Sequence, residues 1–142
     1  MATTYKAARA HGPAVPPGVG DGQALKAASV VFDLGAALVV NDVIEGPTLQ
    51  RGSTVLDVIL VATDLDTGGS PAIALDVGPT SNPDAFIDGS TVGQAGGVAR
   101  GASAPVTLTG NEPINVTVAT GPATGATTGK ISLTVLFLPP NS

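Results

Sequence analysis

The ten residues TVLDVILVAT, numbered 54 to 63, decide the fold class of this chain. The segment is apolar and rich in β-branched residues, with Gly52 before it and an Asp/Gly/Pro-rich stretch after it, which predicts a β-strand and not a helix. Alternation divides the side chains into two faces: Val55, Asp57, Ile59 and Val61 on one, and Leu56, Val58 and Leu60 on the other. Because both faces are mostly apolar, we expect a central strand that is covered on both sides.

Outward from this strand, short apolar segments alternate with turns in both directions. Strands are expected at residues 29–34, 37–45, 72–77, 105–109, 114–119 and 130–138, with a further short strand at 91–94. Residues 84–87 are expected to form a turn, and 89–104 mainly a loop. No segment has the periodicity of an amphipathic helix, so the pattern predicts an all-β antiparallel sandwich or jelly roll of about eight strands. Periodicity alone does not separate a jelly roll from an immunoglobulin-like topology.

The N-terminal segment differs from this body in composition and in charge. Residues 1–27 are rich in Pro and Gly and have no sustained period, which predicts an extended or disordered arm ahead of a β-domain at 28–142. Residues 1–26 hold three cations and one acid, whereas residues 27–142 hold three cations and ten acids. We expect Tyr5, Lys6 and Arg9 to contact a partner surface when the arm becomes ordered on it.

The composition of the whole chain favours one domain that associates with other chains. Its 142 residues suffice for a single core, and charged residues make up 12%, against about 25% in an average protein. A surface with so little charge is expected to be covered in part by partner chains. No apolar run approaches the ~20 residues that span a bilayer, and the N-terminus has no apolar signal segment. We therefore expect a protein made in a cytoplasm, with no membrane partner.

Residues suited to catalysis are scarce. His11 is the only histidine and lies in the predicted arm, and there is no cysteine, which argues against a catalytic triad and a zinc site. The glycine-rich stretch at 93–101 is not followed by a helical pattern, as a phosphate-binding loop would require. The acidic body argues against nucleic-acid binding. The sequence thus predicts no enzyme, no cofactor and no nucleic-acid partner.

Two further features leave alternatives open. Asp64 and Asp66 are candidate Ca²⁺ ligands, although the other ligands of an EF-hand loop are missing. The alternative is that these carboxylates start turns by accepting nearby backbone N–H groups. Arg100, in the glycine-rich stretch, is a candidate contact to a neighbouring subunit.

Several stretches carry a resemblance to a known family. They are LQRGSTVLDV at 49–58, DLD at 64–66, LDVG at 75–78, PDAFI at 83–87 and GKISLTV at 129–135. Over about residues 28–138 the chain resembles the capsid decoration, or cement, proteins of tailed phages, which have a jelly-roll body.

The resemblance implies a structural virion protein with no catalytic role. Such a protein would sit as a homotrimer on the exterior of the capsid, bridge neighbouring subunits of the major capsid protein, and stabilise the head against the pressure of the packaged DNA. It would be made in the host cytoplasm. The alternative is a carbohydrate- or receptor-binding β module of a phage fibre or tail.

Overall fold

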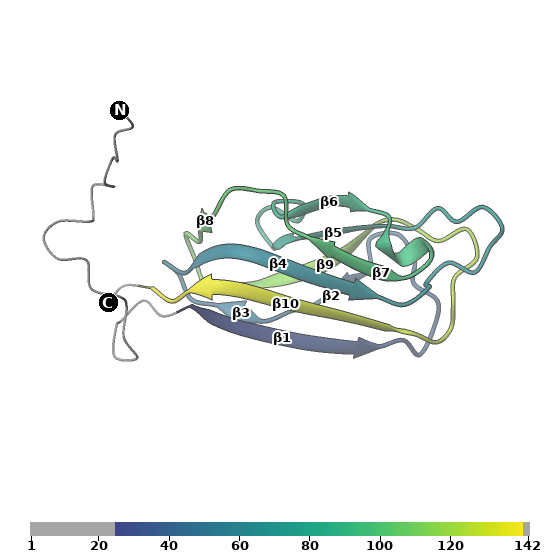
Figure 1. The fold of residues 1–142 in the computed structure, drawn as a ribbon, viewed down its shortest axis with the longest axis horizontal. Helices are drawn as coiled ribbons and strands as arrows, with labels where there is room; N and C mark the ends of the chain where they lie inside the picture. The colour runs from purple at the N-terminus through teal and green to yellow at the C-terminus, as the bar shows by residue number, and fades with distance from the viewer. Residues whose placement is uncertain (1–24, 141–142) are drawn as a thin grey trace, which may run out of the picture.

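A computed structural model describes residues 25–140 as one β-sandwich. Its described part contains ten strands and one short 3₁₀ turn (Figure 1). The strands are β1 (Lys26–Asp33), β2 (Val43–Ile44), β3 (Thr48–Leu49), β4 (Thr54–Ala62), β5 (Ala74–Pro79), β6 (Ile87–Ser90), β7 (Gly97–Arg100), β8 (Val106–Thr107), β9 (Glu112–Thr120) and β10 (Lys130–Leu138). This part of the chain has no helix long and apolar enough to cross a bilayer.

The strands form two antiparallel sheets. The front sheet has the order β1-β10-β4-β7, with β8 also paired to β4, and the back sheet has the order β2-β9-β5-β6, with β3 also paired to β9. Figure 1 shows the front sheet nearest the viewer. Because β2 and β3 both pair with β9, and β7 and β8 both pair with β4, each of these pairs is one interrupted strand.

Counted in this way, the sandwich has eight strands. Successive strands cross from one sheet to the other, except for the β5–β6 hairpin, which stays within the back sheet. This is the strand order of a jelly roll. The prediction of an antiparallel sandwich with a jelly-roll body of about eight strands is confirmed.

The core lies between the sheets and is almost entirely aliphatic. Its central members are Val55, Val58 and Leu60 of β4, Ile131, Leu133 and Val135 of β10, Leu75 and Val77 of β5, and Ile114, Val116 and Val118 of β9. Each fully buried side chain of this size contributes about 1.5–3 kcal/mol relative to exposure. In the strands expected at 72–77, 114–119 and 130–138, buried side chains recur at every second position, as the period of a strand requires.

The break between β2 and β3 has a steric cause. Pro47 accepts a hydrogen bond from Ile114 N at 3.0 Å, which brings the 45–47 segment against β9. At Gly46 a Cβ atom would collide with the carbonyl oxygen of Ile114. Glycine is therefore required at the point where the two backbones touch.

The strand that decided the fold class contains an irregularity that the sequence pattern missed. Leu136 pairs with Asp57, but the next residue, Phe137, pairs with Val55, so β4 has a β-bulge at Leu56. Val55 and Val58 are consequently both buried. The predicted division of the two faces was therefore wrong at Val55 and Leu56, before the end of the bulge, and correct from Asp57 to Val61. The outer side of β4 is also not covered by any described residue, as Leu56 and Val61 are exposed.

Three other expectations were wrong in detail. Of the strand predicted at 37–45, only β2 forms, because residues 35–42 cross from one sheet to the other. Residues 92–94 form the 3₁₀ turn and not a strand, while β7 lies in the stretch predicted as loop. β1 begins at Lys26, so the last two residues assigned to the arm pair with β10.

Candidate interaction surface

The outer side of the front sheet exposes several apolar side chains: Val31, Leu56, Val61 and Val98. The strand register shows which residues share this side. Val98 of β7 pairs with Val61 of β4, Val61 pairs with Ser132 of β10, and Ser132 pairs with Val31 of β1. Paired residues point to the same side of a sheet, so these four form one row across all four strands. Val31 and Val98 are 64% and 61% exposed. We call this side the front face.

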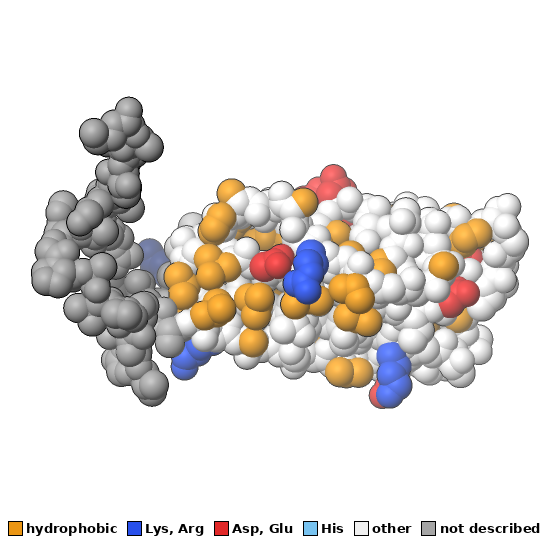
Figure 2. All heavy atoms as spheres, viewed as in Figure 1, with side chains coloured by type: hydrophobic (Ala, Val, Ile, Leu, Met, Phe, Trp, Pro, Cys, Tyr) orange, Lys and Arg blue, Asp and Glu red, His pale blue; other side chains and the backbone are white. Residues whose placement is uncertain are grey.

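The next rows of paired residues on this face are also mostly uncharged. Ile59 pairs with Arg100 and with Thr134, and the hydroxyl groups of Thr134 and Ser29 hydrogen-bond at 2.8 Å. Beyond them lie Leu56 at the bulge and Leu136. Figure 2 shows the apolar side chains spread over this side of the molecule, with one acidic and one basic group among them.

The charges on the front face are balanced. Arg100 Nη1 lies 3.7 Å from Asp57 Oδ2, and at one end of the sheet Lys130 Nζ lies 3.3 Å from Asp33 Oδ1. Asp57 Oδ1 also accepts the backbone N–H of Gly101 at 3.1 Å, which ties the end of β7 to the bulge. The face therefore has no net charge, although the described residues as a whole are acidic.

The outer side of the back sheet is polar and acidic. Val43, Thr117 and Asp76 form a row across β2, β9 and β5, and Asp76 accepts the N–H of Gly89 at 2.7 Å. Asp88 lies exposed on β6. The two outer faces of the sandwich thus differ in charge, and only the front face is suited to a neutral partner surface.

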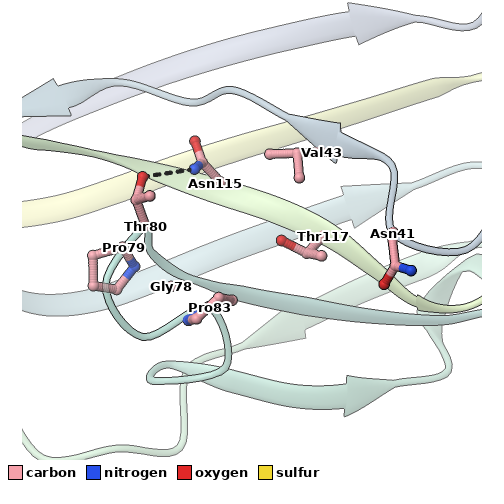
Figure 3. Close-up of a pocket in the computed structure, with 8 residues that line it drawn as sticks. All are labelled: Asn41, Val43, Gly78, Pro79, Thr80, Pro83, Asn115 and Thr117. Atoms are coloured by element: carbon pink, nitrogen blue, oxygen red, sulfur yellow. Dashed lines mark hydrogen bonds between the residues drawn. The ribbon is translucent and has the colours of Figure 1, made fainter.

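A shallow groove of about 330 Å³ lies on this back side. Figure 3 shows its lining side chains, among them Asn41, Thr117 and the buried Asn115. Asn115 Nδ2 donates to Thr80 Oγ1 at 3.3 Å, and Asn115 Oδ1 accepts the N–H of Gly46 at the same distance. Both polar atoms of Asn115 therefore serve to join the break after β2 to the end of β5.

One end of the sandwich holds both ends of the described chain. Lys26, at the start of β1, pairs with Phe137 near the end of β10, and Arg51 lies in the turn before Thr54, which pairs with Leu138. Two of the four described cations are therefore found at this end. We call it the terminal end, and it also bears a depression of about 290 Å³ between β8 and the 79–85 turn.

The site residues expected from sequence fall into three places. Tyr5, Lys6 and Arg9 lie outside the described residues. Arg100 lies on the front face. Asp64 and Asp66 lie in the β4–β5 connection, and the described residues contain no group of three or more His, Cys, Asp and Glu side chains that could hold a metal ion.

The carboxylate of Asp66 binds backbone N–H groups. Its carboxylate is buried and accepts five N–H groups, from Gly68, Ala72, Ile73, Ala123 and Thr124. Asp64 Oδ1 accepts the N–H of Asp66 at 3.0 Å, as in an Asx turn. Burial alone would raise the pKa of Asp66, but the backbone donors outweigh it and hold the pKa far below its ordinary value. The geometry supports turn formation for both carboxylates.

Sequence reasoning missed the front face because both sides of the central strand were expected to be covered and because Val98 was expected to lie in a loop. Asp57, the only charge in the central strand, could have revealed it, because acidic side chains are almost never fully buried unless paired.

No protein-family model matches the chain, and no curated protein matches it. Solved structures do match. A chain in the capsid asymmetric unit of cyanophage Pam1 is 30% identical with a TM-score of 0.80, and the match covers 99% of this chain and 100% of that one. A chain in the capsid of Ralstonia phage GP4 is 33% identical with a TM-score of 0.73, and covers 91% of each chain.

A third similarity concerns the fold alone. A chain in the acidic stable capsid structure of Helicobacter pylori bacteriophage KHP30 has a TM-score of 0.53 at 19% identity, over 83% of this chain and 95% of that one. The Pam1 and GP4 matches, which are at least 30% identical over nearly all of both chains, identify the family: this chain belongs to the phage capsid-associated β-sandwich proteins that they represent.

Proposed function

We propose that this protein is a capsid decoration, or cement, protein that binds the outer surface of a phage head as a homotrimer and bridges subunits of the major capsid protein. The observation that carries the proposal is the similarity over 99% of the chain to a chain of the Pam1 capsid. The protein would be made in the host cytoplasm and would end in the virion, on the capsid exterior.

The chemistry of the described residues agrees with a structural role without enzymatic activity. Their one strongly perturbed carboxylate, Asp66, has its oxygens engaged by backbone amides and not directed into a cleft. A catalytic carboxylate with a shifted pKa must reach a substrate. Asp66 instead fixes two connections of the sandwich.

The terminal end is the surface best suited to the capsid. Lys26 and Arg51 lie there together with the acids Asp84 and Glu112, and the chain before residue 25 adds Lys6 and Arg9. We propose that residues 1–27 form an arm that reaches an acidic capsid surface, with Tyr5 as its aromatic anchor. Cations on an arm speed association with an acidic partner and make it depend on salt.

Binding to heads that lack this protein tests the proposal. Saturable binding is expected for the wild-type chain. The variant Tyr5→Ala/Lys6→Gln/Arg9→Gln should bind at least about tenfold more weakly, because charge-assisted contacts contribute about 1.5–3 kcal/mol each. Lys6→Arg/Arg9→Lys, which keeps both positive charges and Tyr5, is the control and should bind as wild type. Unchanged binding of the triple variant would refute the role of the arm, and absence of wild-type binding would refute the function.

The groove on the back sheet favours one alternative, a carbohydrate- or receptor-binding module of a fibre or tail. Amide and hydroxyl groups such as those of Asn41 and Thr117 suit the hydrogen-bonding pattern of sugars, and the groove is open to solvent. A glycan array distinguishes the two functions. Selective glycan binding that is lost in Asn41→Ala, together with no affinity for heads, would favour the alternative.

A further inference from the structure

The exposed apolar side chains of the sandwich fall into two separate sets. Four lie on the front face: Val31, Leu56, Val61 and Val98. Four others lie along the edge segment, which we define as residues 32–43, running from the end of β1 to β2: Phe32, Val39, Val40 and Val43. Among the described residues, only Leu25 is a large exposed hydrophobic residue outside both sets.

The edge segment joins the outermost strands of the two sheets. β1 is at the edge of the front sheet and β2 at the edge of the back sheet. The eight residues of β1 pair with β10 on one side, and no described strand pairs with the other side. A long edge strand beside exposed apolar side chains is a surface that proteins normally cover.

The paired charges on the front face disfavour a charged partner surface. Its ions are already matched in pairs, Asp57 with Arg100 and Asp33 with Lys130, so a charged partner would find no free counter-charge on it. Lys26 and Arg51, which would attract an acidic capsid, lie at the terminal end instead. The partner that matches such a face is therefore a largely apolar one. The edge segment of a second copy supplies four exposed apolar side chains, and its two acids are already engaged: Asp33 pairs with Lys130, and Asp42 Oδ2 accepts the N–H of Val39.

We infer that the front face of one copy packs against the edge segment of the next. Two different patches that meet head to tail form a heterologous interface, which closes into a ring when the rotation permits. This inference rests on the proposed homotrimer and names the surfaces that build it. Arg100, the predicted neighbour contact, lies within the front face and stays paired with Asp57 in this arrangement.

Two single substitutions test the two sides of the contact. Val98→Glu puts a charge on the front face, and Val40→Lys puts one on the edge segment; both side chains are more than half exposed, so folding should be unaffected. Each variant should raise the dissociation constant of self-association about a hundredfold, because an unpaired charge buried at an interface costs several kcal/mol. Leu25→Glu is the matched control, and its self-association should equal that of the wild type.

Mixing the two variants tests the head-to-tail geometry. Each variant retains the surface that the other has lost, and the new Glu and Lys face each other at the remaining contact. Light scattering should find each variant alone at the 13.8 kDa monomer mass and the equimolar mixture associated. If Val40→Lys alone associates like the wild type, the edge segment is not part of the contact and the inference is wrong.

The other possible results also bear on the proposed subunit contact. If Val98→Glu is unfolded by circular dichroism, Val31→Glu on β1 replaces it with the same expectation. If both fold and associate as wild type, the front face is not the subunit contact. A wild-type chain that is monomeric at micromolar concentration overturns the inference, whereas binding to heads, measured separately, decides the proposed function.

Discussion

Asp66 Oδ2 lies 2.8 Å from the backbone nitrogen of Ala123, which follows it in the chain by 57 residues. The same oxygen accepts the N–H of Ala72 at 2.6 Å. One carboxylate thus joins the β4–β5 connection to the β9–β10 connection at the end of the sandwich opposite the terminal end. Because the N–H groups are close to a buried carboxylate, they are satisfied without water.

Replacing Asp66 with Asn should destabilise the protein strongly. The amide places an NH₂ group, in place of one oxygen, against backbone donors, which leaves buried N–H groups without an acceptor. The midpoint of thermal unfolding should fall by at least about 5 °C. Asp64→Asn is the control, because Asp64 accepts a single N–H group of the described residues, that of Asp66. Equal midpoints for the two variants would contradict the role assigned to Asp66.

The lowered pKa of Asp66 also predicts a dependence of stability on pH. A carboxyl group whose pKa is lower in the folded state stabilises fully above its unfolded pKa of about 3.9 and loses this contribution as pH falls toward the folded pKa. Urea unfolding of the wild type should therefore show a decreasing free energy of unfolding from about pH 5 to pH 3. Asp66→Asn should have a shallower decrease, and parallel curves for the two proteins would argue against the assignment.

Gly46 should not tolerate a side chain. A Cβ atom at this position would collide with the carbonyl of Ile114, so Gly46→Ala must displace the segment from β9. A loss of about 2–4 kcal/mol in the free energy of unfolding is expected. Gly35→Ala is the matched control, since nothing lies within 4 Å of its Cβ position, and should stay within about 0.5 kcal/mol of the wild type. Similar losses for both variants would refute the steric explanation.

Ser53 should be replaceable by Ala without loss. Its side chain is buried, and its Oγ finds no hydrogen-bond partner among the described residues. Removing a buried hydroxyl that has no partner is neutral or stabilises by about 1 kcal/mol. Ser29→Ala, which breaks the 2.8 Å contact with Thr134, should cost up to about 1 kcal/mol. A larger loss for Ser53→Ala than for Ser29→Ala would mean that the buried hydroxyl is bonded.

Sequence reasoning succeeded where one strand alone determines its structure. β10 has the bounds that alternation predicted. In the strand expected at 114–119 the alternating residues Ile114, Val116 and Val118 are buried, because a period of two is a local property. The all-β class followed from the same local signals.

It failed where the structure depends on partners distant in the chain. The bulge in β4 arises from its register with β10, and the interruption at Gly46 arises from the approach of Ile114 on β9. Neither partner is visible in the local pattern. For the same reason the outer side of the central strand was expected to be covered, although Leu56 and Val61 are exposed in the single chain.

The central claim is that this protein stabilises a phage head from outside, and cryo-electron microscopy of heads incubated with the purified chain tests it most directly. The account predicts density for the sandwich on the outer capsid surface, in clusters of three that span neighbouring subunits, with the terminal end toward the shell. Heads that remain bare at saturating protein, or density on the inner surface, would contradict it.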